Sequence, residues 1–195
     1  MGDKMTAATK QFIIAEVVET VICVAAVLWF IWMLTTPITP KPIKIQLPTE
    51  QSIRKEMKHE QLEKQYLRAA ATARAIYHRN GCRSTFAIET GRAAIDYGVP
   101  PRILAALVFV ESSCNSSATS RDGSIGLTQP NTRVWKFTKA QLLNPEFNLR
   151  AGASILASNV RRYGLKQGLH AYNGFGNKTD DYSTKVLTAA GIHVS

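Results

Sequence analysis

The chain has 195 residues, of which 45% are hydrophobic, and this composition excludes a disordered or a fibrous protein. The length suits one ordinary domain with an appendage. The formal net charge of +10 favours a polyanionic partner such as anionic lipid or an acidic cell-wall polymer, whereas the absence of any nucleic-acid-binding motif leads us to expect no nucleic acid.

The first apolar segment, residues 12–36, is long enough to cross a bilayer as a helix, which takes about 20 residues. We predict an N-terminal tail over residues 1–11 and a single transmembrane helix over residues 12–36, with the lipid bilayer as a partner. Trp29 and Trp32 lie toward its end, where aromatic residues gather at a membrane surface. The alternative is a cleaved signal peptide, but no small-residue cleavage site follows the tryptophans.

Residues 37–48 are rich in proline, which predicts an extended, semi-rigid linker. Residues 49–80 then carry charged and apolar residues at helical spacing, which predicts a long amphipathic helix with a stop signal at Asn80 and Gly81. Its predicted apolar side consists of Ile53, Met57, Leu62, Tyr66, Leu67 and Ala70.

Residues 81–195 have the pattern of short helices joined by polar loops, so we predict a mainly α domain. No convincing alternating strand pattern is present, and at most a small ribbon is expected near Ser124. Glycine and proline residues mark most of the helix boundaries. The predicted helices cover residues 86–97, 101–113, 146–163 and 181–190.

Glu111 ends an apolar run and is followed by small and polar residues. At helical spacing, Leu104, Leu107 and Val108 share its side of the helix, so the carboxyl group is carried on an apolar stripe. Apolar surroundings disfavour the charged form and raise the pKa of a carboxyl group, which suits a general acid. The alternative is a glutamate at a helix end that turns to water or pairs with an arginine.

Residues 85–187, about half of the chain, resemble the soluble lytic transglycosylase family, relatives of goose-type lysozyme that cleave peptidoglycan. Three blocks in the family's order carry the resemblance: YGVPPRILAALVFVESSCNSSATSRDGSIGLTQ, LLNPEFNLRAGASILASNVRRYG and AYNGFG. The resemblance implies a lysozyme-like catalytic domain, within residues 81–195, with peptidoglycan as its partner.

The resemblance implies that Glu111 is the catalytic acid. The residues that it places at the substrate are Ser112, Ser120, Gln129, Tyr172, Asn173 and Tyr182. Roles in turns and helix caps are the alternative for several of them, since serine, asparagine and glutamine often serve there. The chain departs from the family at Cys114, Thr128 and Pro130, and we expect these departures to alter the floor of the cleft.

A single carboxylate fits a lytic transglycosylase, because an ordinary glycosidase needs a second acid at a set separation. The resemblance implies that Glu111 protonates the β-1,4 bond between MurNAc and GlcNAc and then takes the proton of the 6-hydroxyl, which gives 1,6-anhydro-MurNAc ends and opens the cell wall locally. One alternative is a lysozyme-type muramidase, for which Asp122 is the nearest later acid. The other is a non-catalytic peptidoglycan-binding protein with a structural role in a membrane or virion.

No cofactor and no metal is expected, because the four histidines lack ligand spacing. Cys82 and Cys114 are candidates for a disulfide in a cell-envelope domain, the alternative being two isolated apolar thiols. Since peptidoglycan lies outside the cytoplasmic membrane, we expect a single-pass protein with its catalytic domain on the periplasmic or extracytoplasmic side. A bacteriophage origin would place it in a virion membrane, with membrane or virion proteins as further partners.

Overall fold

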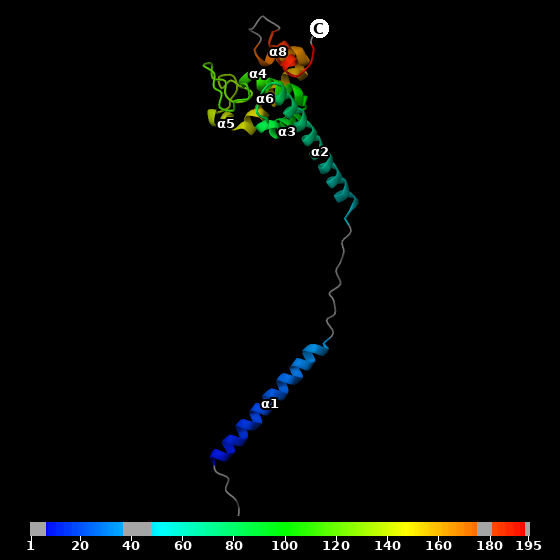
Figure 1. Ribbon diagram of the computed structural model, residues 1–195, viewed down its shortest axis with the longest axis vertical. Coiled ribbons are helices and arrows are strands. Elements are labelled where there is room, and N and C mark those ends of the chain that lie inside the picture. The colour runs from blue at the N-terminus through cyan, green and yellow to red at the C-terminus, as the bar shows by residue number, and fades with distance from the viewer. Residues whose placement is uncertain (1–6, 37–47, 175–180, 194–195) are drawn as a thin grey trace, which may run out of the picture. The chain divides into compact units, whose positions relative to one another are not determined.

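The computed structural model describes residues 7–36, 48–174 and 181–193 (Figure 1). The chain divides into two compact units, residues 1–47 and residues 48–195.

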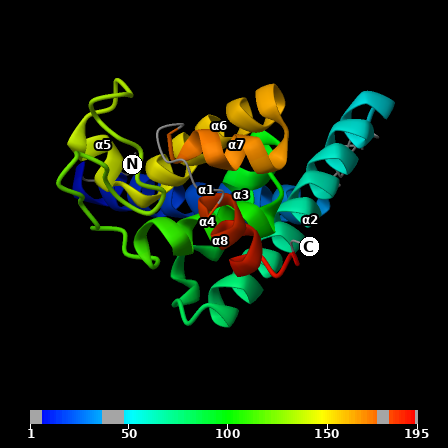
Figure 2. The same cartoon turned by 90° about the horizontal axis from the view of Figure 1, so that it is seen from above.

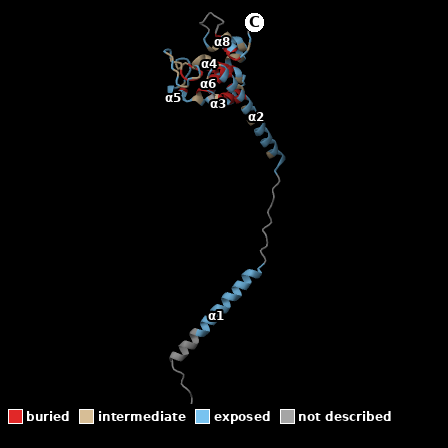
Figure 3. Cartoon of the chain, viewed as in Figure 1, coloured by how far each residue is buried: buried red, intermediate tan, exposed pale blue. Residues whose placement is uncertain are grey.

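The described part of the first unit is one long helix, α1 (Ala7–Thr35). It begins before the predicted span, because the alanines at its start favour helix as well. Within it, Glu16–Thr35 is long and apolar enough to cross a membrane, and none of this stretch is buried inside the protein (Figure 3). Thr20 and Thr35 donate their hydroxyl groups to carbonyls one turn earlier, which satisfies these polar groups within the helix.

The second unit is mainly α, as the sequence predicts. Over its described residues it contains no strand, and two isolated bridges, Thr119–Ile125 and Ser124–Asn131, form the small ribbon expected near Ser124. Its helices are α2 (Glu50–Arg79), α3 (Ala87–Tyr97), α4 (Pro101–Ser112), α5 (Lys139–Leu143), α6 (Pro145–Tyr163), α7 (Leu165–Tyr172) and α8 (Asp181–Ala189), with a 3₁₀ turn at Ser84–Phe86.

Helix α4 lies at the centre of the core. Six consecutive residues, Ile103 to Val108, are buried, and α2, α3 and α8 pack around the helix. Gly98 ends α3 in the left-handed conformation, with φ 69°, and Pro101 opens α4. Helices α6 and α7 lie side by side (Figure 2), and α6 also packs on α3.

The apolar side that we predicted for α2 is wrong for most of its length. Ile53, Met57, Leu62 and Leu67 are exposed, at 38% to 67%. The buried residues are Ala69, Ala70, Ala73, Ile76 and Tyr77, all in the second half. The reason is a close approach of α3, since a Cβ atom on Gly91 would lie 2.5 Å from the backbone nitrogen of Ala70. Small residues, rather than the longest apolar stripe, therefore decide where α2 packs.

A disulfide joins Cys82, which follows α2, to Cys114, which follows α4. The two Cα atoms are 6.0 Å apart, within the range that a disulfide spans. Both residues pack against the main core rather than standing as isolated thiols. The bridge ties the end of α4, close to Glu111, to the end of α2.

Candidate active site

Glu111 lies in the last turn of α4 and is half-buried. Leu104, Leu107 and Val108, which share its side of the helix, are fully buried. Burial raises the pKa of the Glu111 carboxyl group to about 7, although a hydrogen bond from Tyr182 opposes the rise. A carboxyl group with this pKa is partly protonated near neutral pH, so it can both donate and accept a proton.

Tyr182, on α8, donates its hydroxyl hydrogen to Oε1 of Glu111 at 2.5 Å. The tyrosine is buried, at 9% exposure, and burial together with the nearby Glu111 charge raises its pKa well above the usual range. Its hydroxyl group therefore keeps its proton and remains a donor. The structure thus brings Tyr182 to the carboxyl group of Glu111, whereas the described lining of the cleft does not include it.

Glu111 opens into a cleft of about 320 Å³. Its walls come from the loop that follows α4, from α6 and from the end of α7. Glu111 is the only acidic side chain among the described residues that line the cleft, whose polar lining otherwise consists mainly of amides. In the described ranges of the chain, no group of three or more His, Cys, Asp or Glu side chains gathers to hold a metal ion.

The end of α7 contributes Tyr172 and Asn173 to this cleft. The Tyr172 hydroxyl group donates to the carbonyl oxygen of Thr128 at 2.7 Å, which ties α7 to the loop after α4. Burial and the Glu111 charge raise the pKa of Tyr172, so it also stays protonated. Asn173 is exposed at the end of the helix and lines the cleft.

Gln129 lines the cleft but also holds its own loop. The residue has φ 51°, and its Nε2 atom donates to the carbonyl oxygens of Gly126, at 2.7 Å, and Ala118, at 3.2 Å. Its amide nitrogen is thus engaged within the protein. A substrate would meet mainly its amide oxygen.

Ser112 and Ser120 are not among the described residues that line the cleft. The hydroxyl group of Ser112 lies 2.9 Å from the carbonyl oxygen of Leu127, and that of Ser120 accepts the N–H of Ser124 at 2.9 Å. These contacts hold the loop after α4 in place. Gln129, Tyr172 and Asn173 are therefore the predicted substrate residues that the structure brings to the cleft.

The departures from the family pattern mostly do not reach the cleft. Thr128 is fully buried, and Cys114 is part of the disulfide. Only Pro130 lines the cleft. Thr128 and Cys114 are absent from the described lining, so of the three departures only the one at Pro130 reaches the cleft directly.

Asn148, on α6, is not among the residues predicted from the sequence, yet it organises the loop beneath the cleft. It is fully buried, and its Oδ1 atom accepts the N–H and the hydroxyl hydrogen of Thr128, at 2.8 Å and 2.7 Å. Its Nδ2 atom donates to the carbonyl oxygens of Ile125 and Leu142. An asparagine at a core position of an apolar helix was the signal that would have identified it.

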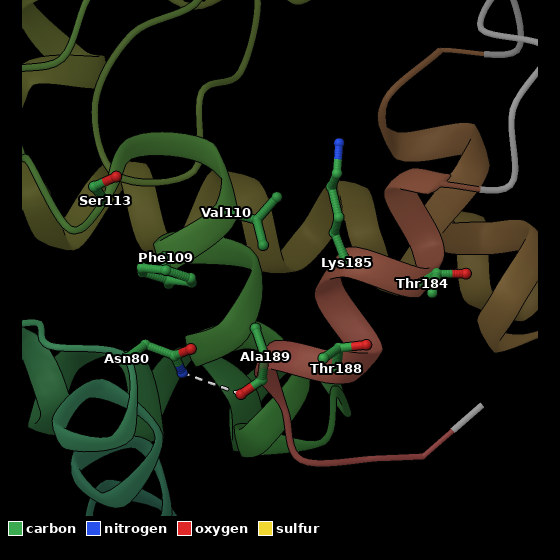
Figure 4. Close-up of a pocket in the computed structure, with 8 residues that line it drawn as sticks. All are labelled: Asn80, Phe109, Val110, Ser113, Thr184, Lys185, Thr188 and Ala189. Atoms are coloured by element: carbon green, nitrogen blue, oxygen red, sulfur yellow. Dashed lines mark hydrogen bonds between the residues drawn. The ribbon is translucent and has the colours of Figure 1, made fainter.

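A second hollow, of about 480 Å³, lies between α4 and α8 (Figure 4). Phe109 and Val110 line it, and Asn80 closes one side by donating from Nδ2 to the carbonyl oxygen of Ala189 at 3.1 Å. Although this hollow is larger than the cleft, its described lining contains no carboxylate. We therefore place the candidate active site in the cleft of Glu111, whose lining contains a carboxyl group with a raised pKa.

Residues 90–192 match the family model described as "Transglycosylase SLT domain". The chain is 35% identical over 105 residues to a protein named "Transglycosylase" of Enterobacteria phage PRD1, covering 50% of this chain and 40% of that protein. It is 28% identical over 94 residues to "Endo-type membrane-bound lytic murein transglycosylase A" of Cronobacter sakazakii, covering 42% of this chain and 45% of that protein. The chain thus spans less than half the length of either relative.

Proposed function

The chain belongs to the transglycosylase SLT domain family, and we propose that it is a lytic transglycosylase that cleaves the glycan strands of peptidoglycan. The observation that carries the proposal is Glu111, a carboxyl group with a pKa of about 7 that is the only acid in the described lining of the cleft. Glu111 and the cleft residues around it fall within the matched range.

The first step uses Glu111 as an acid. Its proton passes to the oxygen of the β-1,4 bond between MurNAc and GlcNAc, the bond from that oxygen to C1 of MurNAc breaks, and the GlcNAc portion leaves with a free 4-hydroxyl group. Positive charge develops at C1. The cleft has no second carboxylate in its described lining to stabilise that charge, so the acetamido oxygen of the substrate supplies the stabilisation, oriented by amides such as Asn173.

The second step uses the same residue as a base. Ionised Glu111 takes the proton of the MurNAc 6-hydroxyl group while the oxygen of that hydroxyl group bonds to C1 of the same sugar. This bond closes a 1,6-anhydro ring. No water enters the balance, and Glu111 ends protonated, as it began. Tyr182 supports both steps, because its hydrogen bond fixes the orientation of the carboxyl group.

A lysozyme-type hydrolase is the alternative, and it would need an acid to activate water. Asp122 is exposed and is not among the described lining residues, and its carbonyl oxygen is held by the side chain of Asn131. This placement favours the transglycosylase. A purely structural wall-binding protein would have no use for an acid whose pKa is raised to about 7.

We further propose that α1 anchors the chain in a membrane as a single span, with the catalytic domain on the periplasmic or extracytoplasmic side. The length, apolar composition and exposure of Glu16–Thr35 support the anchor. The substrate supports the side, because peptidoglycan lies outside the cytoplasmic membrane. The similarity to a phage protein supports a virion membrane as the setting, with membrane or virion proteins as neighbours.

The experiment that tests the function compares the full chain with Glu111→Gln on purified murein. The amide keeps the shape of the side chain but cannot donate the proton, so we expect release of soluble glycan to fall by about a hundred- to ten-thousandfold. Near-normal release by the variant would assign the acid to another residue. Circular dichroism spectra of both proteins serve as the folding control.

A further inference from the structure

Trp135 is an exposed indole at the mouth of the Glu111 cleft. Its side chain is 39% exposed, and its neighbour Val134 is 70% exposed, yet both line the cleft. The other large apolar side chains exposed in the second unit, among the described residues, lie outside the cleft lining. Val134 and Trp135 are neighbours and together give the polar cleft an exposed apolar surface, which is a feature of ligand-binding grooves.

The loop that carries Trp135 is held in place without any ligand. The backbone N–H of Trp135 donates to the carbonyl oxygen of Asn131 at 2.9 Å, and Asn131 in turn donates from Nδ2 to the carbonyl oxygen of Asp122 at 3.0 Å. Thr132 adds bonds from its N–H and its hydroxyl group to the carbonyl oxygen of Gly123. The loop is therefore tied to the neighbouring turn.

The far end of the loop is anchored in a second small core. Phe137 packs edge-to-face on Phe147, with the ring centroids 5.5 Å apart, and Leu142 is fully buried beside them. Trp135 lies between the hydrogen-bonded residues Asn131 and Thr132 and the packed Phe137. Its own side chain is not part of that small core. The fold thus fixes the backbone that carries the indole, which lowers the entropic cost of ordering the loop when a ligand binds.

From these observations, and resting on the proposed function, the geometry points to Trp135 as a sugar-stacking platform of the cleft. One face of an N-acetylhexosamine ring carries mainly C–H groups, and this face suits the flat, apolar indole. The hydroxyl and acetamido groups at the ring edge need polar partners. The cleft supplies them, because Asn159 on α6 lines it with a side-chain amide that has no hydrogen-bond partner among the described residues.

The platform acts by binding a saccharide ring of the glycan strand in the ground state and the transition state alike. Interactions of this kind lower KM and leave kcat unchanged. The carboxyl chemistry of Glu111 does not depend on it. Loss of the indole is therefore distinguishable from loss of the acid.

The first test is steady-state cleavage of soluble, uncross-linked murein glycan by the full chain in detergent micelles. We expect Trp135→Ala to raise KM about tenfold with little change in kcat, and Trp135→Phe to recover part of the loss. Leu143→Ala is the matched control, because Leu143 is also 39% exposed but does not line the cleft. An unchanged KM in Trp135→Ala would overturn the proposal.

The second test works without turnover, so it separates the platform from the proposed function. The chain has three tryptophans, and the other two, Trp29 and Trp32, lie in α1. Trp29→Phe and Trp32→Phe, combined with Glu111→Gln, leave Trp135 as the single indole. On titration with the tetramer of N-acetylglucosamine, we expect its emission to shift to the blue in a saturable way.

The control for this titration moves the indole. In the same background, Trp135→Phe with Leu143→Trp places the single indole outside the cleft, and its emission should not respond. An absent or non-saturable response at Trp135 would overturn the platform. If Trp135 responds but the wild-type chain releases no murein fragments, the platform stands and the proposed enzymatic function fails.

Discussion

The hydroxyl group of Tyr182 donates to the carboxyl oxygen Oε1 of Glu111 across a sequence separation of 71 residues. The bond connects α8 to the last turn of α4. Burial raises the pKa of Glu111 and this bond lowers it, so the value of about 7 is the balance of the two. The same contact sets both the orientation and the acidity of the residue that we propose as acid and base.

Removing this donor in Tyr182→Phe should raise the pKa of Glu111 further, because only the burial effect would remain. Glu111 would then keep its proton to higher pH, and the alkaline limb of the kcat/KM profile would move upward. We also expect kcat to fall by about tenfold or more, since a hydrogen bond to a charged group is lost. A pH–rate profile of the variant measures both effects. An alkaline limb that does not move would show that Tyr182 does not influence the pKa of Glu111.

The raised pKa of Glu111 also predicts a pH-dependent stability. The folded pKa of about 7 lies above the ordinary value of 4.5, so the unfolded chain releases this proton first as the pH rises. Glu111 therefore destabilises the fold increasingly between about pH 4.5 and pH 7. Glu111→Gln removes this effect.

Thermal unfolding at two pH values tests this prediction. At pH 8 the Glu111→Gln variant should be more stable than the wild-type chain, by on the order of a few kcal/mol, whereas at pH 4 the two should be similar. Equal stability of the two proteins at both pH values would show that Glu111 is not held in buried surroundings that raise its pKa.

The Cys82–Cys114 bridge should contribute to the stability of the second unit. It closes a separation of 32 residues, so Cys82→Ser with Cys114→Ser should lower the free energy of unfolding by about 2–4 kcal/mol. Urea unfolding measures the change. Cys23→Ser is the control, because Cys23 is a free thiol in α1, and the loss should be reproduced in the wild-type chain by a reducing agent. A reduced protein as stable as the oxidised one would contradict this role.

Asn148→Ala should destabilise the loop beneath the cleft. The N–H of Thr128 and the carbonyl oxygens of Ile125 and Leu142 would lose their partner in a buried place, at a cost of about 1–3 kcal/mol for each unsatisfied group. Asn115→Ala is the matched control, because the exposed Asn115 accepts a single backbone N–H, from Ser117. Similar losses of stability in the two variants would argue against the importance of the buried network.

The parts of the fold that could be predicted from the sequence are those fixed locally. Gly98 and Pro101 mark the turn between α3 and α4, and the apolar spacing before Glu111 places the carboxyl group against the core. These features depend on backbone conformation and helical periodicity within a few residues of chain. The mainly α class follows from the same signals.

The parts that could not be predicted depend on contacts between distant segments. The sequence predicts no helix between residues 163 and 181, yet α7 begins directly after Gly164, and Gly168 allows α7 to lie against the backbone of Val160 on α6. The placement of Ser112 and Ser120 outside the described cleft lining likewise depends on how the loop after α4 folds back. Periodicity within one segment carries no information on such contacts.

We propose that Glu111 serves as both acid and base, so that no water enters the products. Digestion of purified murein in water enriched in oxygen-18, followed by mass spectrometry of the glycan ends, tests it most directly. We expect 1,6-anhydro ends without the label, which are lighter than the ends produced by hydrolysis in ordinary water by one water molecule, about 18 Da. Labelled reducing ends as the main product, together with loss of activity in Asp122→Asn, would contradict it and identify a hydrolase.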